Sequence, residues 1–499
     1  MLPCGSASLG VEKGVEQSKE LGVVAKKKNH ATNLWVGISL LFGVGGLLGT
    51  SRLAVAESAY SAPKQDDPTI QEGGCGDKLF EDTATDLRNY NAQYCPDGDN
   101  VSDATNVFDP KALFNDCQMG CGVLGEPWTA ISLFDTECGG KRFQDTGWIF
   151  GGFTQWGYQS GPDGAFAGNG PFVSQKEYKF FGLNQQYLFA GKVADGSKGF
   201  DWGFRTDVIF GLDGNEGQAF GNVDAGTYDY FNGFNYGAYE WAFPQLYAEV
   251  AMGSLSVKAG HFYTPIGYEV IPSNGNFFLS RQLTFYNSEP FTHTGALGTY
   301  KTSDQLSLMG GWVLGMDTGF SQYDAGNSAI GGFTYTIDDK TSLFYAGIYG
   351  NLGWRGHGAI NSVTVNRKWA EKWSTVHQFD VLGTNANVDF NVNPTPTAFV
   401  PGPPGAGVAR NSTGLINYAF YDINATMKAG VRYEWYKADG TSYQTLTGGV
   451  NVKPIANVII RPEVRYMFSE GNHQTYTGPD YSGELFNQTQ FGIDAILTF

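Results

Sequence analysis

Apolar and polar side chains alternate, residue by residue, along many segments of residues 146–499. In FDWGFRTDVIFGL (200–212), aromatic residues such as Trp202 and Phe204 share one face, whereas Arg205 and Asp207 share the other. Successive side chains of a β-strand point to opposite faces, so the segment predicts a strand with one apolar and one charged face. The same alternation recurs at 427–437, 458–468 and 491–499.

Counting every such segment predicts sixteen strands. An even number is typical of bacterial single-chain membrane barrels, and most of the segments are long enough to cross a bilayer at a tilt. The expected strands lie at 147–158, 181–193, 199–212, 243–252, 254–263, 292–302, 304–316, 329–338, 340–352, 359–369, 372–383, 412–423, 426–437, 442–453, 456–469 and 486–499.

The connections between these strands alternate between short and long. Short ones include 252–254, 302–304, 338–339 and 370–371, while long ones include 264–291. Short periplasmic turns with longer outer loops are typical of outer-membrane barrels, and a β-sandwich has no reason to keep that order. The sequence therefore predicts an all-β fold, a transmembrane antiparallel β-barrel of about 16 strands.

Composition agrees with a barrel wall that faces lipid. Aromatic residues make up 15% of the chain and charged residues 16%, against about 25% charged in an ordinary soluble domain. Tryptophan rings favour membrane interfaces. We therefore expect tryptophans in or beside the predicted strands to form aromatic girdles at the two membrane interfaces. These tryptophans are Trp148, Trp156, Trp202, Trp241, Trp312, Trp369, Trp373 and Trp435.

The N-terminal third divides into two further parts. Residues 1–56 read as a signal peptide, because Lys26–Lys28 precede the apolar stretch Leu34–Leu48 and the small residues Ala54–Ala56. An uncleaved membrane anchor is the alternative. Residues 57–145 form an acidic segment, expected in the periplasm, where its cysteines would make two disulfides of unreadable pairing. These cysteines are Cys75, Cys95, Cys117, Cys121 and Cys138.

Charge and motif content exclude several functions. The formal net charge is −17, which argues against nucleic acid as a partner, since phosphate binding needs basic patches. The chain has no G-x-S-x-G, P-loop or H-E-x-x-H motif. The sequence therefore nominates no catalytic residue, no cofactor and no metal ligand, and we expect no enzyme.

Two stretches carry a resemblance to a known family. The first is Gly260–Glu269, which resembles the G-x-F-x-x-P-x-x-x-E stretch of phosphate-selective-type porins. The second is the run through Asn276–Phe278 and on to Thr294–Gly295, which looks like the putative β-barrel porin family, the OmpL-like outer-membrane porins. This resemblance covers roughly residues 146–499. The terminal Phe499 resembles the signal that the barrel-assembly machinery of the outer membrane reads.

The resemblance implies a bacterial outer-membrane porin surrounded by lipid. It implies passive diffusion of small hydrophilic solutes or ions through a water-filled barrel, and a homotrimer. A sixteen-stranded barrel leaves an aqueous lumen, which we expect the loop 264–291 to narrow. A structural or adhesive barrel without an open channel is one alternative, and a secreted soluble β-rich glycan-binding protein is the other.

Few basic residues are expected to face the lumen, unlike in phosphate-selective members. They are Arg205, Lys258, Arg367, Lys428, Arg432, Arg461 and Arg465. Residues 146–499 hold 20 basic and 29 acidic residues, which favours a weak cation preference.

The charged inward residues and the loop nominate candidates for the pore lining or the constriction. They are Arg205, Asp207, Lys258, Glu269, Glu289, Arg432, Glu434, Arg461, Glu463 and Arg465. Two interpretations of these charges stay open. In the first, Arg432, Arg461 and Arg465 form a basic patch that faces Glu269 and Glu289 on the loop and orients dipolar solutes. In the second, the inward arginines and glutamates pair in a solvated network that only stiffens the wall.

Overall fold

The structure is a computed structural model. It describes residues 124, 128–131, 146–160, 181–222, 228–230, 232–234, 236, 239–385, 411–438, 441–468 and 488–499. The predicted signal peptide, all five cysteines of the acidic segment and most of the connection 384–411 lie outside the described residues.

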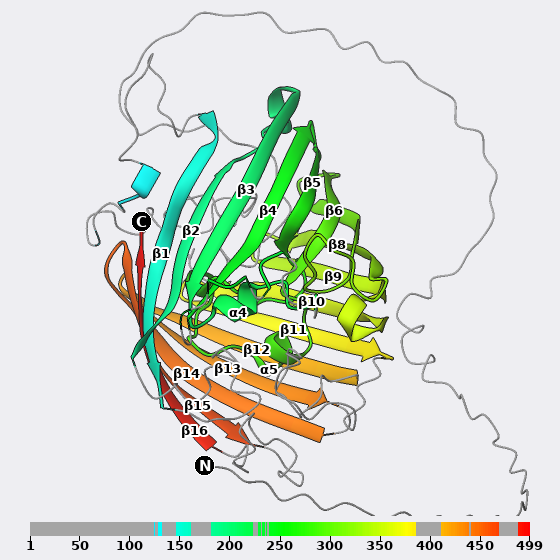
Figure 1. The fold of residues 1–499 in the computed structure, drawn as a ribbon. Coiled ribbons are helices and arrows are strands. Elements are labelled where there is room, and N and C mark those ends of the chain that lie inside the picture. The colour runs from blue at the N-terminus through cyan, green and yellow to red at the C-terminus, as the bar shows by residue number, and fades with distance from the viewer. Residues whose placement is uncertain are drawn as a thin grey trace, which may run out of the picture. The chain divides into compact units, whose positions relative to one another are not determined.

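The described residues form one closed antiparallel barrel, in which each strand pairs with its neighbours in sequence and β1 pairs with β16 (Figure 1). The prediction of a sixteen-stranded barrel is confirmed, and strand ends differ from the expected ones by at most three residues. The strands are β1 (Trp148–Gln159), β2 (Gly182–Lys192), β3 (Phe200–Gly211), β4 (Glu240–Met252), β5 (Leu255–Tyr263), β6 (Thr292–Lys301), β7 (Leu306–Val313), β8 (Asn327–Asp338), β9 (Thr341–Asn351), β10 (His357–Ala370), β11 (Trp373–Thr384), β12 (Asn411–Asn424), β13 (Met427–Ala438), β14 (Thr441–Ile455), β15 (Val458–Phe468) and β16 (Gln488–Thr498).

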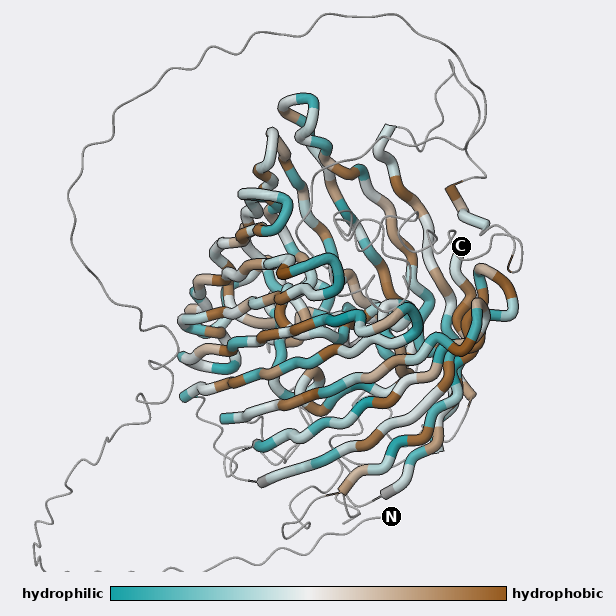
Figure 2. The backbone as a smooth tube through the Cα atoms, turned by 180° about the vertical axis from the view of Figure 1, so that it is seen from behind, coloured by the Kyte–Doolittle hydropathy of each residue, from teal (hydrophilic) through white to brown (hydrophobic). Residues whose placement is uncertain are grey.

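Outward-facing positions of the strands are mostly apolar, as the alternation predicts, whereas the inner face carries the buried polar and charged side chains together with buried apolar clusters. Figure 2 shows brown and teal residues alternating along the strands. Trp202, Trp312, Phe379, Val431 and Phe491 each expose roughly half of their surface. A soluble protein would bury that apolar face, so the secreted soluble alternative does not fit this wall.

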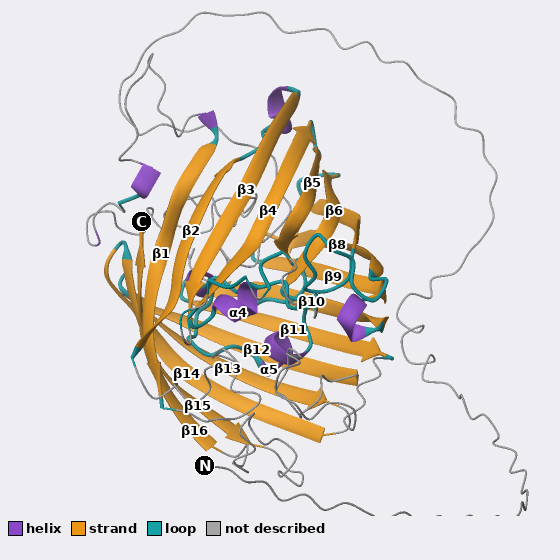
Figure 3. Ribbon diagram, viewed as in Figure 1, coloured by secondary structure: helices purple, strands orange, loops and turns teal. Residues whose placement is uncertain are grey.

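Helices are few and short in the part of the chain that the structure describes (Figure 3). The two α-helices are α4 (Gly214–Gly217), which follows β3, and α5 (Leu283–Asn287), which belongs to the connection between β5 and β6. None of the helices in the described ranges is both long enough and apolar enough to cross a membrane.

One inward assignment is wrong. Arg367 lies on the outward face of β10, because it shares the parity of Val365 and Trp369, and Trp369 is exposed. Its guanidinium stacks 4.5 Å from the Trp369 ring and lies 3.9 Å from Asp338. The aromatic neighbour holds the charge at the outer surface, where an Arg can keep contact with water.

Candidate constriction site

The connection from Thr264 to Phe291 folds into the barrel rather than away from it. Nearly all of its residues are buried, and apolar side chains along it pack against several inner walls. Ile271, Phe285 and Phe291 pack with residues of β1–β4, whereas Phe277 and Phe278 pack with residues of β11 and β12. We call this segment, residues 264–291, the inner loop.

A loop buried in this way must find partners for its own backbone, since buried N–H and C=O groups are costly when unpaired. Carboxylates on the wall supply acceptors. Glu463 on β15 accepts the N–H groups of Leu279 (2.7 Å) and Ser280 (3.1 Å).

Glu434 on β13 acts in the same way four residues further along the inner loop. It accepts the N–H groups of Leu283 (2.8 Å) and Thr284 (2.7 Å). These N–H groups open α5, where no earlier turn supplies acceptors, and a negative charge is favourable at that helix end.

Arginines on the wall supply the matching donors. Arg432 forms an ion pair with Glu269 of the inner loop and donates to the Ser280 carbonyl (2.8 Å). Arg461 pairs with Asp494 on β16 and donates to the Ser273 carbonyl (2.8 Å). The charged residues of β13 and β15 thus bind the backbone of the inner loop, and their arginines also pair with carboxylates of the loop and of β16.

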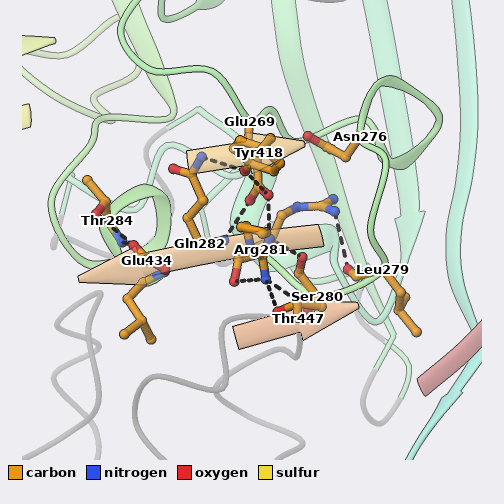
Figure 4. A network of polar contacts seen from close by, with 12 residues as sticks. Glu269, Asn276, Leu279, Ser280, Arg281, Gln282, Thr284, Tyr418, Glu434 and Thr447 are labelled. Carbon is orange, nitrogen blue, oxygen red and sulfur yellow. Dashed lines mark hydrogen bonds and ion pairs between the residues drawn. The ribbon is translucent and has the colours of Figure 1, made fainter. Parts of the chain in front are cut away.

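Tyr418 and Gln282 complete the network around Glu269 (Figure 4). The Tyr418 hydroxyl donates to Glu269 (2.7 Å), and the Gln282 side chain donates to Tyr418 (2.6 Å). The Gln282 backbone N–H also donates to Glu269 (2.6 Å). Glu269 therefore accepts from two strands of the wall and from its own loop.

Glu289 contacts a different wall from the arginines. Gln378 on β11 donates to Glu289 (2.6 Å) and to Asp380 (3.0 Å), so one amide joins two carboxyl groups. Burial, followed by the neighbouring Asp380 carboxyl, raises the pKa of Glu289. Gly267 sits against this side chain at φ +94°, and a Cβ there would lie 1.9 Å from a Glu289 oxygen, so only glycine fits.

The wall beneath the inner loop also carries glycines. A Cβ on Gly414 would lie 2.3 Å from the Thr284 hydroxyl, and one on Gly430 would lie 2.4 Å from the Phe277 ring. The inner loop therefore packs directly on the backbone of β12 and β13. The apolar–polar alternation of the strands places these glycines on the inner face. The sequence does not show that they leave room for Thr284 and Phe277 of the inner loop, which only the structure reveals.

Two of the remaining candidates lie apart from this network. Arg205 pairs with Asp207 on β3, and its guanidinium lies 4.1 Å from the Phe189 ring. Lys258 is half-buried on β5, 4.7 Å from the Phe262 ring. Arg465, buried on β15, belongs to the network, because it pairs in register with Thr447, to which Arg432 donates (3.3 Å).

The structure thus brings Glu269, Arg432, Glu434, Arg461 and Glu463 together, and Glu289 joins them through Gln378, whose side-chain oxygen accepts from Gln282 (3.0 Å). Their side chains are almost completely buried. Sequence reasoning missed Gln185 on β2, which accepts the Ser273 N–H of the inner loop (3.0 Å) and donates to the Ile271 carbonyl (2.8 Å). It also missed Gln282, Gln378, Tyr418 and Asp494, although the strand members of this set carry polar groups at inward positions. Among the described residues, no group of His, Cys, Asp and Glu could hold a metal ion.

A closed barrel that is apolar outside and ionic inside, with a loop folded into it, defines an integral outer-membrane barrel protein. The family model described as "Putative beta-barrel porin-2, OmpL-like" matches residues 146–499. The chain belongs to this porin family, and its place is the bacterial outer membrane. No curated protein matches the chain.

Solved porin structures are similar to this chain at low identity. The outer membrane channel DcaP of Acinetobacter baumannii is 10% identical over 70% of this chain and 97% of its own, with a TM-score of 0.44. The anion-selective porin from Comamonas acidovorans is 11% identical over 70% and 99%, with a TM-score of 0.45. OmpF of Salmonella typhi, in complex with daunomycin, is 13% identical over 72% and 99%, with a TM-score of 0.48.

Proposed function

We propose that this porin passes small hydrophilic solutes or ions by passive diffusion, and that the inner loop sets the size limit. The observation that supports this proposal is the course of residues 264–291, which enter the barrel and bind its inner walls through Glu434, Glu463 and Arg432. A segment held in the lumen reduces the cross-section open to solutes.

Single-channel recording on the purified protein in planar bilayers tests this proposal. A diffusion porin gives stepwise conductance that rises with salt concentration, and permeation of neutral sugars should stop above a size limit. Absence of conductance from protein with heat-modifiable gel mobility would instead identify a structural or adhesive barrel.

We also propose a weak cation preference. Residues 146–499 carry more acidic than basic side chains, and three buried arginines, Arg205, Arg432 and Arg461, each pair with a carboxylate. Pairing offsets the field of these arginines in the lumen. Reversal potentials under a salt gradient measure the preference, and a clear anion preference would overturn it.

The partners follow from the same family membership. We propose that the protein is a homotrimer in the outer membrane and that the barrel-assembly machinery reads Phe499. Mass determination in detergent, with the detergent contribution subtracted, distinguishes a trimer from a monomer. The likeness of Gly260–Glu269 to phosphate-selective-type porins stays a prediction, which competition by phosphate for the conductance would test.

A further inference from the structure

A short piece of the N-terminal segment lies against the end of the barrel where the first and last strands meet. Asn457, in the turn between β14 and β15, accepts the Trp128 N–H through its side-chain oxygen (2.8 Å). Its side-chain nitrogen donates to the Trp128 carbonyl (2.7 Å). One amide therefore binds both backbone groups of one residue, as a neighbouring strand would.

The same amide also reaches the last strand. The side-chain nitrogen of Asn457 donates to the Thr498 carbonyl (2.8 Å). The backbone carbonyl of Asn457 accepts the Thr498 N–H (2.9 Å). Asn457 is only 8% exposed. Its three side-chain contacts need one acceptor and one donor group together, which asparagine combines at this length and aspartate, having no donor, does not.

Phe499 lies beneath this contact. Its ring centroid is 6.3 Å from that of Trp128, and its backbone exchanges two hydrogen bonds of 2.9 Å with Gly152 on β1. Nearby, Ala130 and Ile131 are almost fully buried, and the Ala456 N–H donates to the Leu124 carbonyl. Leu124 and Trp128 thus contact the turn between β14 and β15, and Trp128 also contacts the C-terminal Phe499.

We propose that Trp128–Ile131 act as a clasp, which Asn457 fastens to the end of the last strand and which packs on Phe499 after the barrel has been assembled. A ring that packs against Trp128 cannot at the same time enter the binding site of another protein. The timing rests on the proposed reading of Phe499 by the assembly machinery, whereas the clasp itself rests only on the contacts of Asn457.

Asn457→Asp in the full-length protein tests the clasp. It keeps the size of the side chain but removes the donor to Trp128 and Thr498. Hydrogen–deuterium exchange at 128–131 and at 495–499 should rise roughly tenfold or more, because two bonds are lost, while the inner loop keeps its protection.

Asn424→Asp is the matched control. Asn424 accepts the N–H and the hydroxyl of Thr426 (both 2.9 Å) in an exposed turn at the same rim, and an aspartate accepts both. Hydrogen–deuterium exchange of this variant at 128–131 should equal that of the unchanged protein. Equal exchange in the Asn457 and Asn424 variants would overturn the clasp.

The order of events is tested by the rate at which newly made protein acquires heat-modifiable mobility. Asn457→Asp should match the unchanged protein, whereas Phe499→Ala should be slower. If Asn457→Asp is as slow as Phe499→Ala, the clasp acts during assembly and the proposed order is wrong. If Phe499→Ala is not slower, the reading of Phe499 fails, and the exchange result still decides the clasp.

Discussion

The inner loop meets two very different walls inside the barrel. The inner faces of β12–β16 present charged residues that bind individual backbone atoms of the loop, such as Glu434, Glu463 and Arg461. The inner faces of β6–β10 present apolar residues, such as Met309, Ile330 and Phe344, which pack with Ile266. Hydrogen bonds are directional and apolar burial is not, so the charged wall fixes where the loop lies and the apolar wall only fills space.

The largest effect should follow from Arg432→Met, which leaves Glu269 buried without its cation. Docking of the inner loop should weaken by about 3–5 kcal/mol, the usual effect of breaking a buried pair. We expect larger conductance with more noise in planar bilayers. The double variant Arg432→Met with Glu269→Gln removes both charges and should recover part of the loss. A single variant with unchanged conductance would show that the pair does not hold the loop.

Glu434→Gln should have the next largest effect. The amide keeps one acceptor oxygen for two N–H donors and loses the charge, so docking should weaken by about 1.5–3 kcal/mol. Conductance noise and protease cleavage within 264–291 should both increase. Glu371→Gln, in the exposed turn after β10, loses the same charge and should change neither.

Glu289 predicts a pH dependence of the same docking. Burial and the Asp380 carboxyl raise the pKa of Glu289 in the docked state. At a pH between its ordinary and its raised pKa, Glu289 therefore keeps its proton in the docked loop and loses it when the loop is freed. Below the ordinary glutamate pKa of about 4.3, the free energy of docking does not depend on pH through this group. Above it, docking weakens by about 1.4 kcal/mol per pH unit until the pH passes the raised pKa of Glu289. Conductance noise should therefore grow as pH rises.

Glu289→Gln is the control for this pH effect. Glutamine cannot titrate, and its NH₂ group can donate to Asp380, so it mimics the protonated acid. The noise of this variant should be independent of pH between 5 and 9. A dependence as steep as that of the unchanged protein would assign the effect to another group, with Glu269 and Asp380 the nearest carboxyls.

The smallest effect belongs to the apolar wall. Ile330→Val removes one methylene from a buried position, which costs about 0.5–1.5 kcal/mol. The barrel should unfold at a slightly lower urea concentration, while conductance and its noise stay the same. A change in conductance as large as that of Glu434→Gln would mean that both walls position the loop.

The strands could be predicted from the sequence because lipid on one side and a polar interior on the other impose a two-residue period along every strand. The same period placed Arg432, Glu434 and Arg461 on the inner face. Arg367 was assigned inwards although Val365 and Trp369 share its parity, so the apolar character of that face was the better guide.

The partners inside the barrel could not be predicted in the same way. Glu463 binds Leu279 and Ser280 across 184 and 183 positions of the sequence, and no local pattern joins them. Glu289 contacts β11 rather than the arginines because the fold of the loop, with Gly267 packed against Glu289, decides which wall each end of it reaches. Glu269 and Arg432 could be listed as candidates, but their pairing needed the structure.

The separation of the inner loop from its anchors orders the folding of the protein. Residues 264–291 lie about 150 positions or more before Glu434 and Glu463 in the sequence, and contacts between such distant residues form slowly. A chain in which β13 and β15 are not yet in place holds a loop whose N–H groups have no carboxylates to bind. We therefore expect the inner loop to dock late in folding, once these strands have joined the barrel.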